Sequence, residues 1–316
     1  MSETPIVRIA SANLELGGVS EAGDADRLGK TLALLREWAP DAVLLQEVTA
    51  RAAESVTGPL WGKIHDEQAR VGGERATEAD SATIDHLAAL AGELGMIPVL
   101  GPPVPLMFRR MHTAILIGKR LELVAAGPPM PVSGTVSPAW TEAIVRVRGV
   151  RHVLGLYSLH MPARSAAMQL IQAEWLASHV AQQGRLTIAG GDWNCLSRAD
   201  DVPGEALRAM KPHLRTARMK REGGQLTADY SVEDVFSAIG MRDAAACLPE
   251  GRREPRELSP TGAAGSRVDR FAVSGEAVPA LRGYRQRATS GSDHHAISIS
   301  VDRTALDEAI PPGYRP

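Results

Sequence analysis

The sequence predicts an α/β fold in which helices and strands form separate layers. Short apolar runs rich in β-branched residues alternate with amphipathic helical stretches early in the chain, and strands cluster later. The chain has 316 residues, of which 44% are hydrophobic, so it can bury a large core without disulfide bonds. This composition excludes a disordered chain, and the alternation favours α/β layers over an all-β barrel.

Short apolar runs read as strands when β-branched residues are frequent in them and turn residues bound them. In chain order these runs are Ile6–Ala12, Ala42–Leu45, Thr113–Ile117, Leu121–Ala125, Ala143–Val147, Val153–Leu159, Leu186–Ala189, Val268–Val273 and Ala296–Val301.

Helices are expected where apolar residues recur at three- and four-residue spacing. These stretches are Ala25–Trp38, Ala79–Leu94, Arg164–Gln182 and Val232–Ile239, and Gly184 follows the third as a natural C-terminal stop. Two further stretches are expected to be loops: Gly101–Pro105, with its prolines, and the polar, basic segment Lys211–Gln225. Neither resembles an interdomain linker, so residues 1–316 are expected to form a single domain.

Charge and targeting features narrow the class of protein. With 35 Lys and Arg against 37 Asp and Glu, the net charge of −2 gives no support to a strongly basic nucleic-acid binder, although a local basic patch remains compatible with one. The N-terminus lacks a basic region before an apolar stretch, and no run is long enough to span a membrane. Cys195 and Cys247 form no metal or disulfide framework. We therefore expect a cytoplasmic protein with no membrane insertion.

Polar residues stand where several expected strands end, and this is the informative feature of the chain. A lone Asn or Gly-Gly-Asp after a strand is usually turn chemistry, and a lone Glu or His there is usually structural. The set as a whole is harder to explain in that way, because loops at strand ends commonly carry functional residues. The residues concerned are Asn13, Gln46-Glu47, His160, Asp192 with Asn194, Asp269, and Asp293-His294.

These pieces resemble the motifs of the endonuclease/exonuclease/phosphatase superfamily, of which deoxyribonuclease I is the best-known member. The resemblance extends over nearly the whole chain, from Asn13 to His294. The matching segments are Ser11–Leu14, Leu45–Val48, Ala114–Leu116, Ser158–His160, Gly190–Asn194, Arg267–Asp269 and Ser292–His294. The resemblance implies a four-layer α/β/β/α sandwich, with an active site where the strands of the two sheets end.

Phosphate-ester hydrolysis requires charge neutralisation on the phosphoryl oxygens and an activated water. Hard oxygen ligands suit Mg²⁺ or Mn²⁺, whereas the sequence offers no Cys/His cluster for zinc. Glu47 is the expected main metal ligand, and the resemblance implies that Asn13 and Asp293 complete the metal's ligand shell directly or through water.

The resemblance also implies the catalytic roles. Asp192 is expected to orient and deprotonate the attacking water, and Asn194 to donate a hydrogen bond to a phosphate oxygen. His160 and His294 are expected to contact the phosphate, with Asp269 holding the His294 tautomer and raising its pKa. The side chain of His295 is expected to point elsewhere, because side chains alternate along a strand.

The sequence departs from the family pattern at one place. Members with a histidine at the position of His160 usually supply an acidic partner for it just before the strand that contains Ala114–Leu116, but residues 107–113 contain no acid. Arg109, Arg110 and His112 are therefore candidates for contacting the substrate phosphate, and a solvated basic turn is an equally good interpretation. The histidine itself favours the deoxyribonuclease and phosphatase branches over the abasic-site endonucleases, which usually have tyrosine there.

The sequence thus predicts a metal-dependent phosphoesterase, with a nuclease acting on DNA or RNA as the leading hypothesis. The basic stretch Lys211–Arg221 is compatible with binding a nucleic-acid backbone or with a solvated face, and no aromatic residues for base stacking accompany it. The first alternative is a phosphatase or phosphodiesterase acting on a phosphorylated small molecule or lipid headgroup. The second is a non-catalytic binding member of the fold, which the intact set of site residues argues against.

Overall fold

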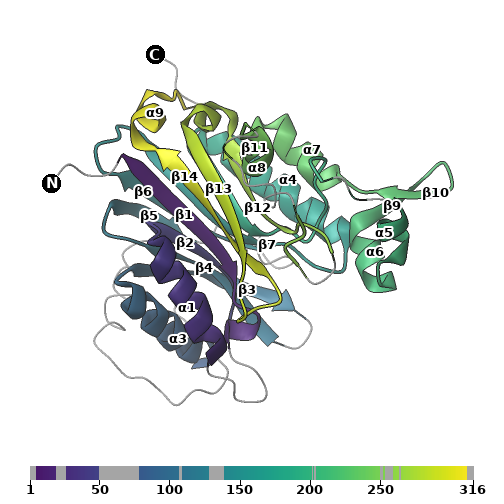
Figure 1. The fold of residues 1–316 in the computed structure, drawn as a ribbon, viewed down its shortest axis with the longest axis horizontal. Coiled ribbons are helices and arrows are strands. Elements are labelled where there is room, and N and C mark those ends of the chain that lie inside the picture. Colours follow the sequence, from purple (N-terminus) through teal and green to yellow (C-terminus); the bar gives the residue numbers. More distant parts are fainter. Residues whose placement is uncertain are drawn as a thin grey trace.

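Two six-stranded mixed sheets lie face to face at the centre of the molecule, with helices on both outer faces (Figure 1). The computed structural model describes residues 5–18, 26–49, 78–106, 109–127, 139–200, 202, 204–249, 252, 259–262 and 265–311. Of the described residues, 16, 26, 78–82, 103–106, 109–110 and 127 are described by their backbone alone. The predicted four-layer α/β/β/α sandwich is confirmed.

The first sheet has the order β13-β14-β1-β2-β4-β3. Strands β1 and β2 are parallel, and the other neighbours are antiparallel. The strand bounds in this sheet are β1 (Ile6–Asn13), β2 (Ala42–Val48), β3 (Ile97–Leu106), β4 (Arg109–Ile117), β13 (Leu281–Ala288) and β14 (His295–Asp302).

The second sheet has the order β11-β12-β8-β7-β6-β5, and here β7 and β8 form the parallel pair. Its strands are β5 (Leu121–Gly127), β6 (Trp140–Val147), β7 (Val153–His160), β8 (Leu186–Asp192), β11 (Met241–Asp243) and β12 (Asp269–Ser274). In each sheet, therefore, the parallel pair lies among the central strands, and its two strands end at the same edge.

The main hydrophobic core lies between the sheets. Alternate residues of each strand point into it, as the two-residue period of a strand requires. Ile9 and Leu44 from the first sheet share this cluster with Leu156, Ile188 and Phe271 from the second, and all of them are fully or almost fully buried. This core fixes the two sheets against each other and so fixes the strand ends of one relative to those of the other.

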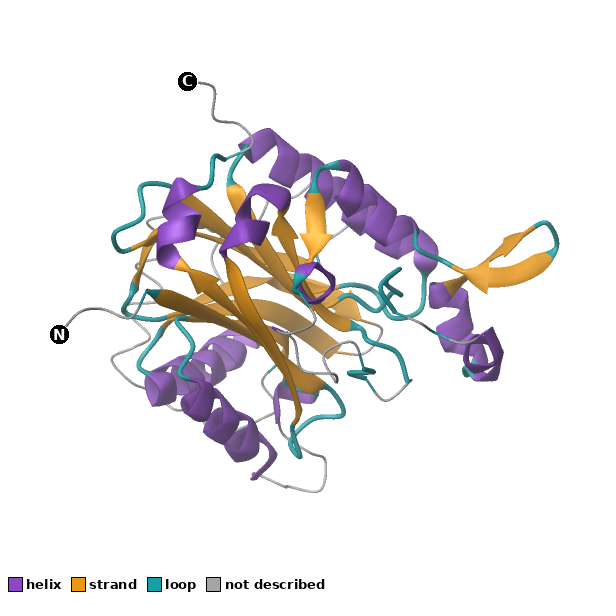
Figure 2. Cartoon of the chain, turned by 45° about the horizontal axis from the view of Figure 1, so that its top comes forward, coloured by secondary structure: helices purple, strands orange, loops and turns teal. Residues whose placement is uncertain are grey.

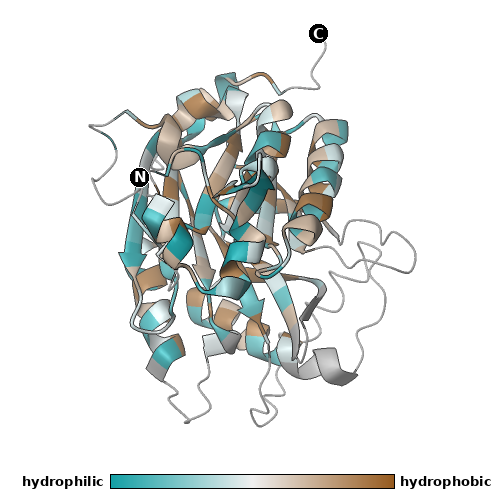
Figure 3. Cartoon of the chain, turned by 90° about the vertical axis from the view of Figure 1, so that its right-hand side faces the viewer, coloured by the Kyte–Doolittle hydropathy of each residue, from teal (hydrophilic) through white to brown (hydrophobic). Residues whose placement is uncertain are grey.

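Amphipathic helices cover the two outer faces, and in Figure 3 they carry hydrophilic and hydrophobic bands. Helices α1 (Asp26–Trp38) and α3 (Glu78–Leu94) pack on the first sheet, and α4 (Ala166–Gln183) and α7 (Ser231–Ala238) pack on the second. Ser165 caps the N-terminus of α4, and Gly184, in the left-handed conformation, ends it as predicted. Every predicted strand and helix has its counterpart in these layers.

An arm formed by residues 204–228 projects from the sandwich (Figures 1 and 2). It consists of α5 (Gly204–Ala209), α6 (Pro212–Arg218) and a hairpin of β9 (Met219–Glu222) and β10 (Gln225–Ala228). The remaining short elements are η1 (Leu16–Gly18), α8 (Ala244–Cys247), η3 (Gly275–Ala280) and α9 (Arg303–Glu308). None of the helices in the described ranges is both long and apolar enough to cross a membrane.

Two predicted loops are wrong. Gly101–Pro105 lies in β3, which tolerates prolines because it is an edge strand, and N–H groups on the outer side of an edge strand take no part in a ladder. Lys211–Gln225 contains α6 and most of the hairpin. Pro212 occupies the start of α6, where its missing N–H is harmless, and Gly223-Gly224 supply the positive φ angles of 57° and 81° that a tight hairpin turn needs.

Candidate active site

The inward-facing positions of the central strands change from apolar to polar at the same level of the sandwich. Along β1, Val7 and Ile9 belong to the inter-sheet core, and Ser11 and Asn13 continue the same face. The same change occurs along three other strands: from Leu44 to Gln46 in β2, from Leu156 to Ser158 and His160 in β7, and from Ile188 to Asp192 in β8. The predicted site residues therefore line one end of the space between the sheets.

Buried hydrogen bonds join the two sheets just below this polar level. Gln46 of the first sheet donates from Nε2 to Oγ of Ser158 in the second sheet at 3.0 Å and accepts from Ser11 at 3.3 Å. Ser158 also donates to the Leu45 carbonyl at 2.8 Å. A Cβ on Gly190 of the second sheet would lie only 2.9 Å from Cδ1 of Leu44 in the first sheet, so only glycine fits there. The sheets thus approach closely where the site begins.

Glu47 owes its position to an irregularity in β2. The pairing of β2 with β4 shifts register between Leu45 and Val48, and Glu47 has a φ of 55°. A bulge of this kind redirects a side chain at the end of a strand. Among the non-glycine residues with positive φ in the described ranges, Glu15, Glu47 and Asn194 lie at this site and only Ala39 lies elsewhere. Strained backbone of this kind is typical of functional sites.

Asp192 lies at the centre of the cluster and is 2% exposed. Its Oδ1 accepts the backbone N–H of Asn194 at 2.9 Å, and its Oδ2 accepts Nδ2 of Asn13 at 3.3 Å. The Nε2 atoms of His160 and His294 lie 3.7 and 3.8 Å from the same Oδ2. Side chains of β1, β7 and the residue just before β14 therefore all surround one carboxylate at the end of β8.

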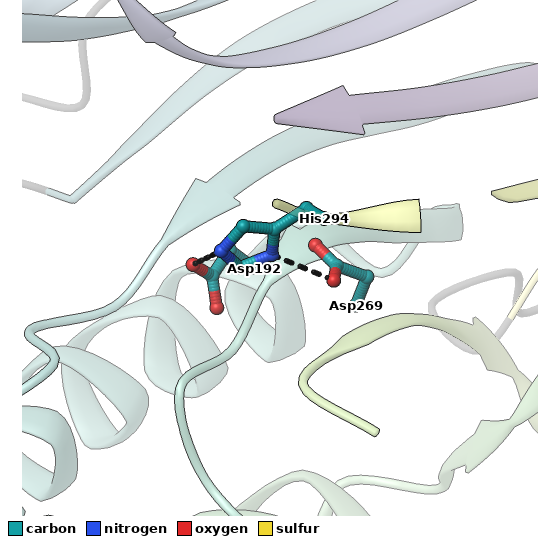
Figure 4. Close-up of side chains that lie close together, drawn as sticks. All are labelled: Asp192, Asp269 and His294. Carbon is teal, nitrogen blue, oxygen red and sulfur yellow. Dashed lines mark hydrogen bonds and ion pairs between the residues drawn. The ribbon is translucent and has the colours of Figure 1, made fainter. Parts of the chain in front are cut away.

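His294 lies between two buried carboxylates, as Figure 4 shows. Its Nδ1 is 2.8 Å from Oδ2 of Asp269, and Asp269 is itself held by its backbone N–H, which donates to Thr261 Oγ1 at 2.8 Å. Burial alone would lower the pKa of His294, but Asp269 and Asp192 outweigh that effect and raise it to about 10. Burial raises the pKa of Asp269. The imidazole is therefore a cation at neutral pH, with Nε2–H directed toward Asp192.

The loop before β14 is fixed by a residue that the sequence did not single out. Glu15 accepts the backbone N–H of Asp293 at 2.9 Å and forms an ion pair with Arg27. The Asp293 side chain is 48% exposed, and its Oδ1 lies 3.8 Å from Nε2 of His294.

The ring of His295 contacts Gln286 at 3.0 Å, away from Asp192 and Asp269, as predicted from strand alternation.

His160 is 5% exposed, and its Nε2 lies 3.9 Å from Glu47 Oε1. Its buried Nδ1 has no hydrogen-bond partner among the described residues, which agrees with the missing acid before the strand of Ala114. His112 is also buried, on β4, with its Nδ1 2.9 Å from the Gly101 carbonyl. The side chains of Arg109 and Arg110 lie outside the described residues.

Asn194 is held by its side chain and its backbone. Its Nδ2 donates to the Met161 carbonyl at 3.0 Å, and its own carbonyl accepts from Gln169 at 3.0 Å. The Oδ1 atom faces Nη2 of Arg218 at 3.5 Å. The amide therefore has a fixed orientation, with its N–H side directed away from the guanidinium.

Two sets of side chains at this site could hold a metal ion. Ligand atoms of Asp192, Asp269 and His294 lie within 4.8 Å of one another. His294 and Asp269 already bond to each other, however, and a protonated imidazole repels a cation. The other set includes the carboxylates of Glu47 and Asp192, both 3.3 Å from the Asn13 amide. These oxygen donors fit Mg²⁺ or Mn²⁺.

Comparison with known proteins agrees with this geometry. The model of the endonuclease/exonuclease/phosphatase family matches residues 10–294. The chain belongs to this family. The matched range takes in every strand end that contributes to the cluster, from Asn13 to His294. Members of the family are typically metal-dependent phosphoester hydrolases. A search of curated proteins found no match.

Solved structures share the family fold. A family member from Bacteroides vulgatus aligns over 94% of this chain and 98% of its own, with a TM-score of 0.60 and 12% identity. One from Bacteroides thetaiotaomicron covers 94% of this chain and 97% of its own, with a TM-score of 0.58 and 13% identity. TDP2 from C. elegans covers 94% and 75%, with a TM-score of 0.53 and 15% identity. At these identities the likeness establishes the fold alone.

Proposed function

We propose that this family member is a divalent-metal-dependent phosphoric ester hydrolase, and specifically a nuclease that cleaves phosphodiester bonds with water activated by Asp192. The observation that carries the proposal is the convergence on Asp192 of Asn13, His160, Asn194 and His294 at the end of the inter-sheet core. Both sheets contribute to this cluster, which also supports our proposal that residues 1–316 act as a single domain.

Glu47, with Asn13 and Asp293 beside it, would hold Mg²⁺ or Mn²⁺. When bound, the cation would neutralise charge on the phosphoryl oxygens and relieve charge on the leaving oxygen. Glu47 suits this role because the bulge in β2 leaves its side chain 17% exposed, in contrast to the more deeply buried Asp192. Exchange of the ion with solvent requires such access.

Asp192 is the proposed general base. Its Oδ1 is held by the Asn194 N–H, so the carboxylate is oriented before substrate binds. Its Oδ2 has longer contacts, at 3.3 Å to Asn13, 3.7 Å to His160 and 3.8 Å to His294, which leaves it able to accept a proton from water.

His294 is the proposed cationic donor to the phosphate. Asp269 binds its Nδ1, so the proton on Nε2 faces the same space as Asp192 Oδ2. His160, on the other side of that oxygen, is the proposed second donor. A preorganised pair of donors stabilises the charge that develops in phosphoryl transfer.

The nuclease assignment is supported by the basic arm. Lys211, just before α6, is exposed, as are Lys220 and Arg221 on β9, and Arg218 at the end of α6 reaches Asn194. A polyanion that extended from the site along the arm would meet these charges. Arg109, Arg110 and His112 remain predictions as phosphate contacts, although His112 is buried on β4.

A substrate panel with Mg²⁺, Mn²⁺ and a chelator tests the proposal. It comprises duplex and single-stranded DNA, RNA, cyclic dinucleotides, inositol phosphates and a chromogenic diester. We expect metal-dependent cleavage of polynucleotides, with an apparent affinity that falls steeply as salt rises because phosphate contacts release counterions. Turnover of small esters alone, with little salt dependence, would indicate a small-molecule phosphatase or phosphodiesterase. Absence of turnover with every metal would indicate a binding protein.

A further inference from the structure

Arg218 is a buried cation beside the site, and its charge has no carboxylate in hydrogen-bond contact among the described residues. It is the last residue of α6 and is 3% exposed. Its Nη2 reaches Oδ1 of Asn194 at 3.5 Å, while its buried Nε and Nη1 have no hydrogen-bond partner in the described part of the chain. Burying a guanidinium in this way is unfavourable, so the feature requires an explanation.

The packing around Arg218 fixes its place. The neighbouring Ala217 and Met219 are buried, and Met219 packs with Leu196, which follows Asn194 closely in sequence. The guanidinium is therefore tied to the segment that carries Asp192 and Asn194. It is covered to the same degree as these two residues, which are 2% and 5% exposed.

The electrostatic environment is consistent with an anion-binding role. Burial lowers the pKa of Arg218, and the nearby Asp192 charge only partly offsets this. Arginine remains a cation in proteins, and its planar fork of N–H donors matches the oxygens of a phosphate.

We propose that Arg218 is a phosphate-binding catalytic residue of this site, with its unpartnered N–H groups donating to a non-bridging oxygen of the substrate phosphate. The proposal rests on the proposed function and extends it. The guanidinium lies on the Asn194 side of Asp192, and His160 and His294 lie around the same Asp192 oxygen. Arginine and the two histidines would therefore hold the phosphate from different directions, with Asp192 among them.

Arg218→Gln is the principal test, with Arg285→Gln as the matched control. Arg285 is an exposed arginine on the edge strand β13, so its substitution removes the same charge away from the site. Arg218→Gln should lower kcat on a chromogenic diester about 10²–10³-fold. It should weaken inhibition by inorganic phosphate about 10- to 100-fold. Its Tm should stay the same or rise, because an unsatisfied buried charge is removed. Arg285→Gln should change none of these.

Chemical rescue separates contact with the phosphate from a purely structural role. In Arg218→Ala, guanidinium ion at non-denaturing concentrations should restore part of kcat, whereas it should not affect Arg285→Gln. The proposal is overturned if Arg218→Gln binds inorganic phosphate as tightly as the unmodified protein. A large drop in Tm with full activity of the folded enzyme would also overturn it.

A measurement of phosphate binding tests the role of Arg218 separately from the proposed hydrolase activity. Stabilisation of the protein by inorganic phosphate with Mg²⁺ can be measured by thermal unfolding, without turnover. If no ester is hydrolysed, the proposed function fails, and loss of phosphate stabilisation in Arg218→Gln would still support Arg218 as the phosphate ligand. If esters are hydrolysed equally well by Arg218→Gln, the inference about Arg218 fails alone.

Discussion

Arg267 and Arg218 are both buried arginines, yet their surroundings are opposite. Arg267 donates from Nε to Asp200 at 2.7 Å and from both terminal nitrogens to Asp243. These carboxylates raise the pKa of Arg267 despite the opposing effect of burial, whereas burial lowers the pKa of Arg218. Arg267 therefore has all its partners supplied by the chain, as a structural charge requires, whereas the donors of Arg218 that lack a partner among the described residues are the groups that we propose bind phosphate.

The same contrast applies to the buried carboxylates. Asp200 and Asp243 are bound by Arg267, and Asp243 also caps α8 through the N–H groups of Ala245 and Ala246. Within the described part of the chain, Asp192 has no ion pair as short as these, since the nearest imidazole nitrogen lies 3.7 Å away. Substitution of a site charge, Asp192 or Arg218, should therefore reduce activity. Substitution of a charge that is paired within the chain, such as Asp200 or Arg267, should reduce stability.

Asp192→Asn should give the largest effect. Removing the proposed base should lower kcat about 10²–10⁴-fold, because general-base contributions have that size. Stability should fall less than in Asp200→Asn, since the amide is close in shape and the nearest imidazole nitrogen lies 3.7 Å from Asp192. Steady-state kinetics and urea unfolding of the same preparation measure both quantities.

Asp200→Asn is the matched control, because it removes a buried carboxylate that is paired. It should lower stability and leave the kcat of the folded protein near its original value. Near-normal turnover by Asp192→Asn would contradict both its assigned role and the distinction between the two classes.

Arg267→Gln should give the next largest effect, on stability. Loss of the guanidinium leaves Asp200 and Asp243 buried without their cation, which costs about 3–5 kcal/mol in comparable cases. Urea unfolding measures the loss. The double variant Arg267→Gln/Asp200→Asn should recover part of it, because one uncompensated carboxylate is then gone. If Arg218→Gln lost as much stability as Arg267→Gln, the comparison between the two arginines would fail.

The sequence predicted the layers because their signal is local. Runs such as Ala296–Val301 are short and rich in β-branched apolar residues, and the strands at these positions follow directly from that pattern. The sequence-based prediction of a loop was wrong for β3. Prolines disfavour a strand unless the strand lies on a sheet edge, and its place at the edge depends on the pairing of distant segments. The hairpin of β9 and β10 was missed because its strands are short and polar, although Gly223-Gly224 was a readable turn signal.

Much of the site was also predictable, because its residues follow strand ends in recognisable motifs. Residues that act through tertiary contacts were not predictable from the sequence. Glu15 and Thr261 hold the loop before β14 and Asp269 only because segments distant in sequence meet. Arg218 lies in a basic stretch that suggested a solvated face, and only the packing of Ala217 and Met219 shows that its guanidinium is buried. One signal was available for Ser11 and Ser158, since each continues the inward face of an apolar strand with a polar residue.

Glu142 is a paired carboxylate nearer the surface than Asp200 and Asp243. Its substitution should give the smallest loss of stability among these paired charges. Its carboxylate accepts from Tyr157 Oη at 2.7 Å and lies 3.0 Å from His179 Nε2, with a side chain that is 12% exposed. Burial raises the pKa of Glu142, but the bonds from His179 and Tyr157 outweigh it and hold the pKa below its ordinary value of 4.5. A depressed carboxyl pKa stabilises the fold fully above the unfolded value, and this contribution is lost as pH falls through the folded value.

Glu142→Gln should therefore lower the free energy of unfolding by about 1–3 kcal/mol at pH 7, the usual range for hydrogen bonds to a charged group. The difference between the two proteins should stay constant down to about pH 5 and shrink below it, as Glu142 becomes protonated in the original protein. Urea unfolding at a series of pH values measures this. Glu122→Gln, which breaks an exposed pair with Arg146, should change stability by less than about 1 kcal/mol. If the difference in unfolding free energy between Glu142→Gln and the original protein persisted unchanged at pH 3, or grew on acidification, the charge of Glu142 would not be what stabilises the fold. Glu142 would then not belong with Asp200 and Asp243 as a paired structural carboxylate.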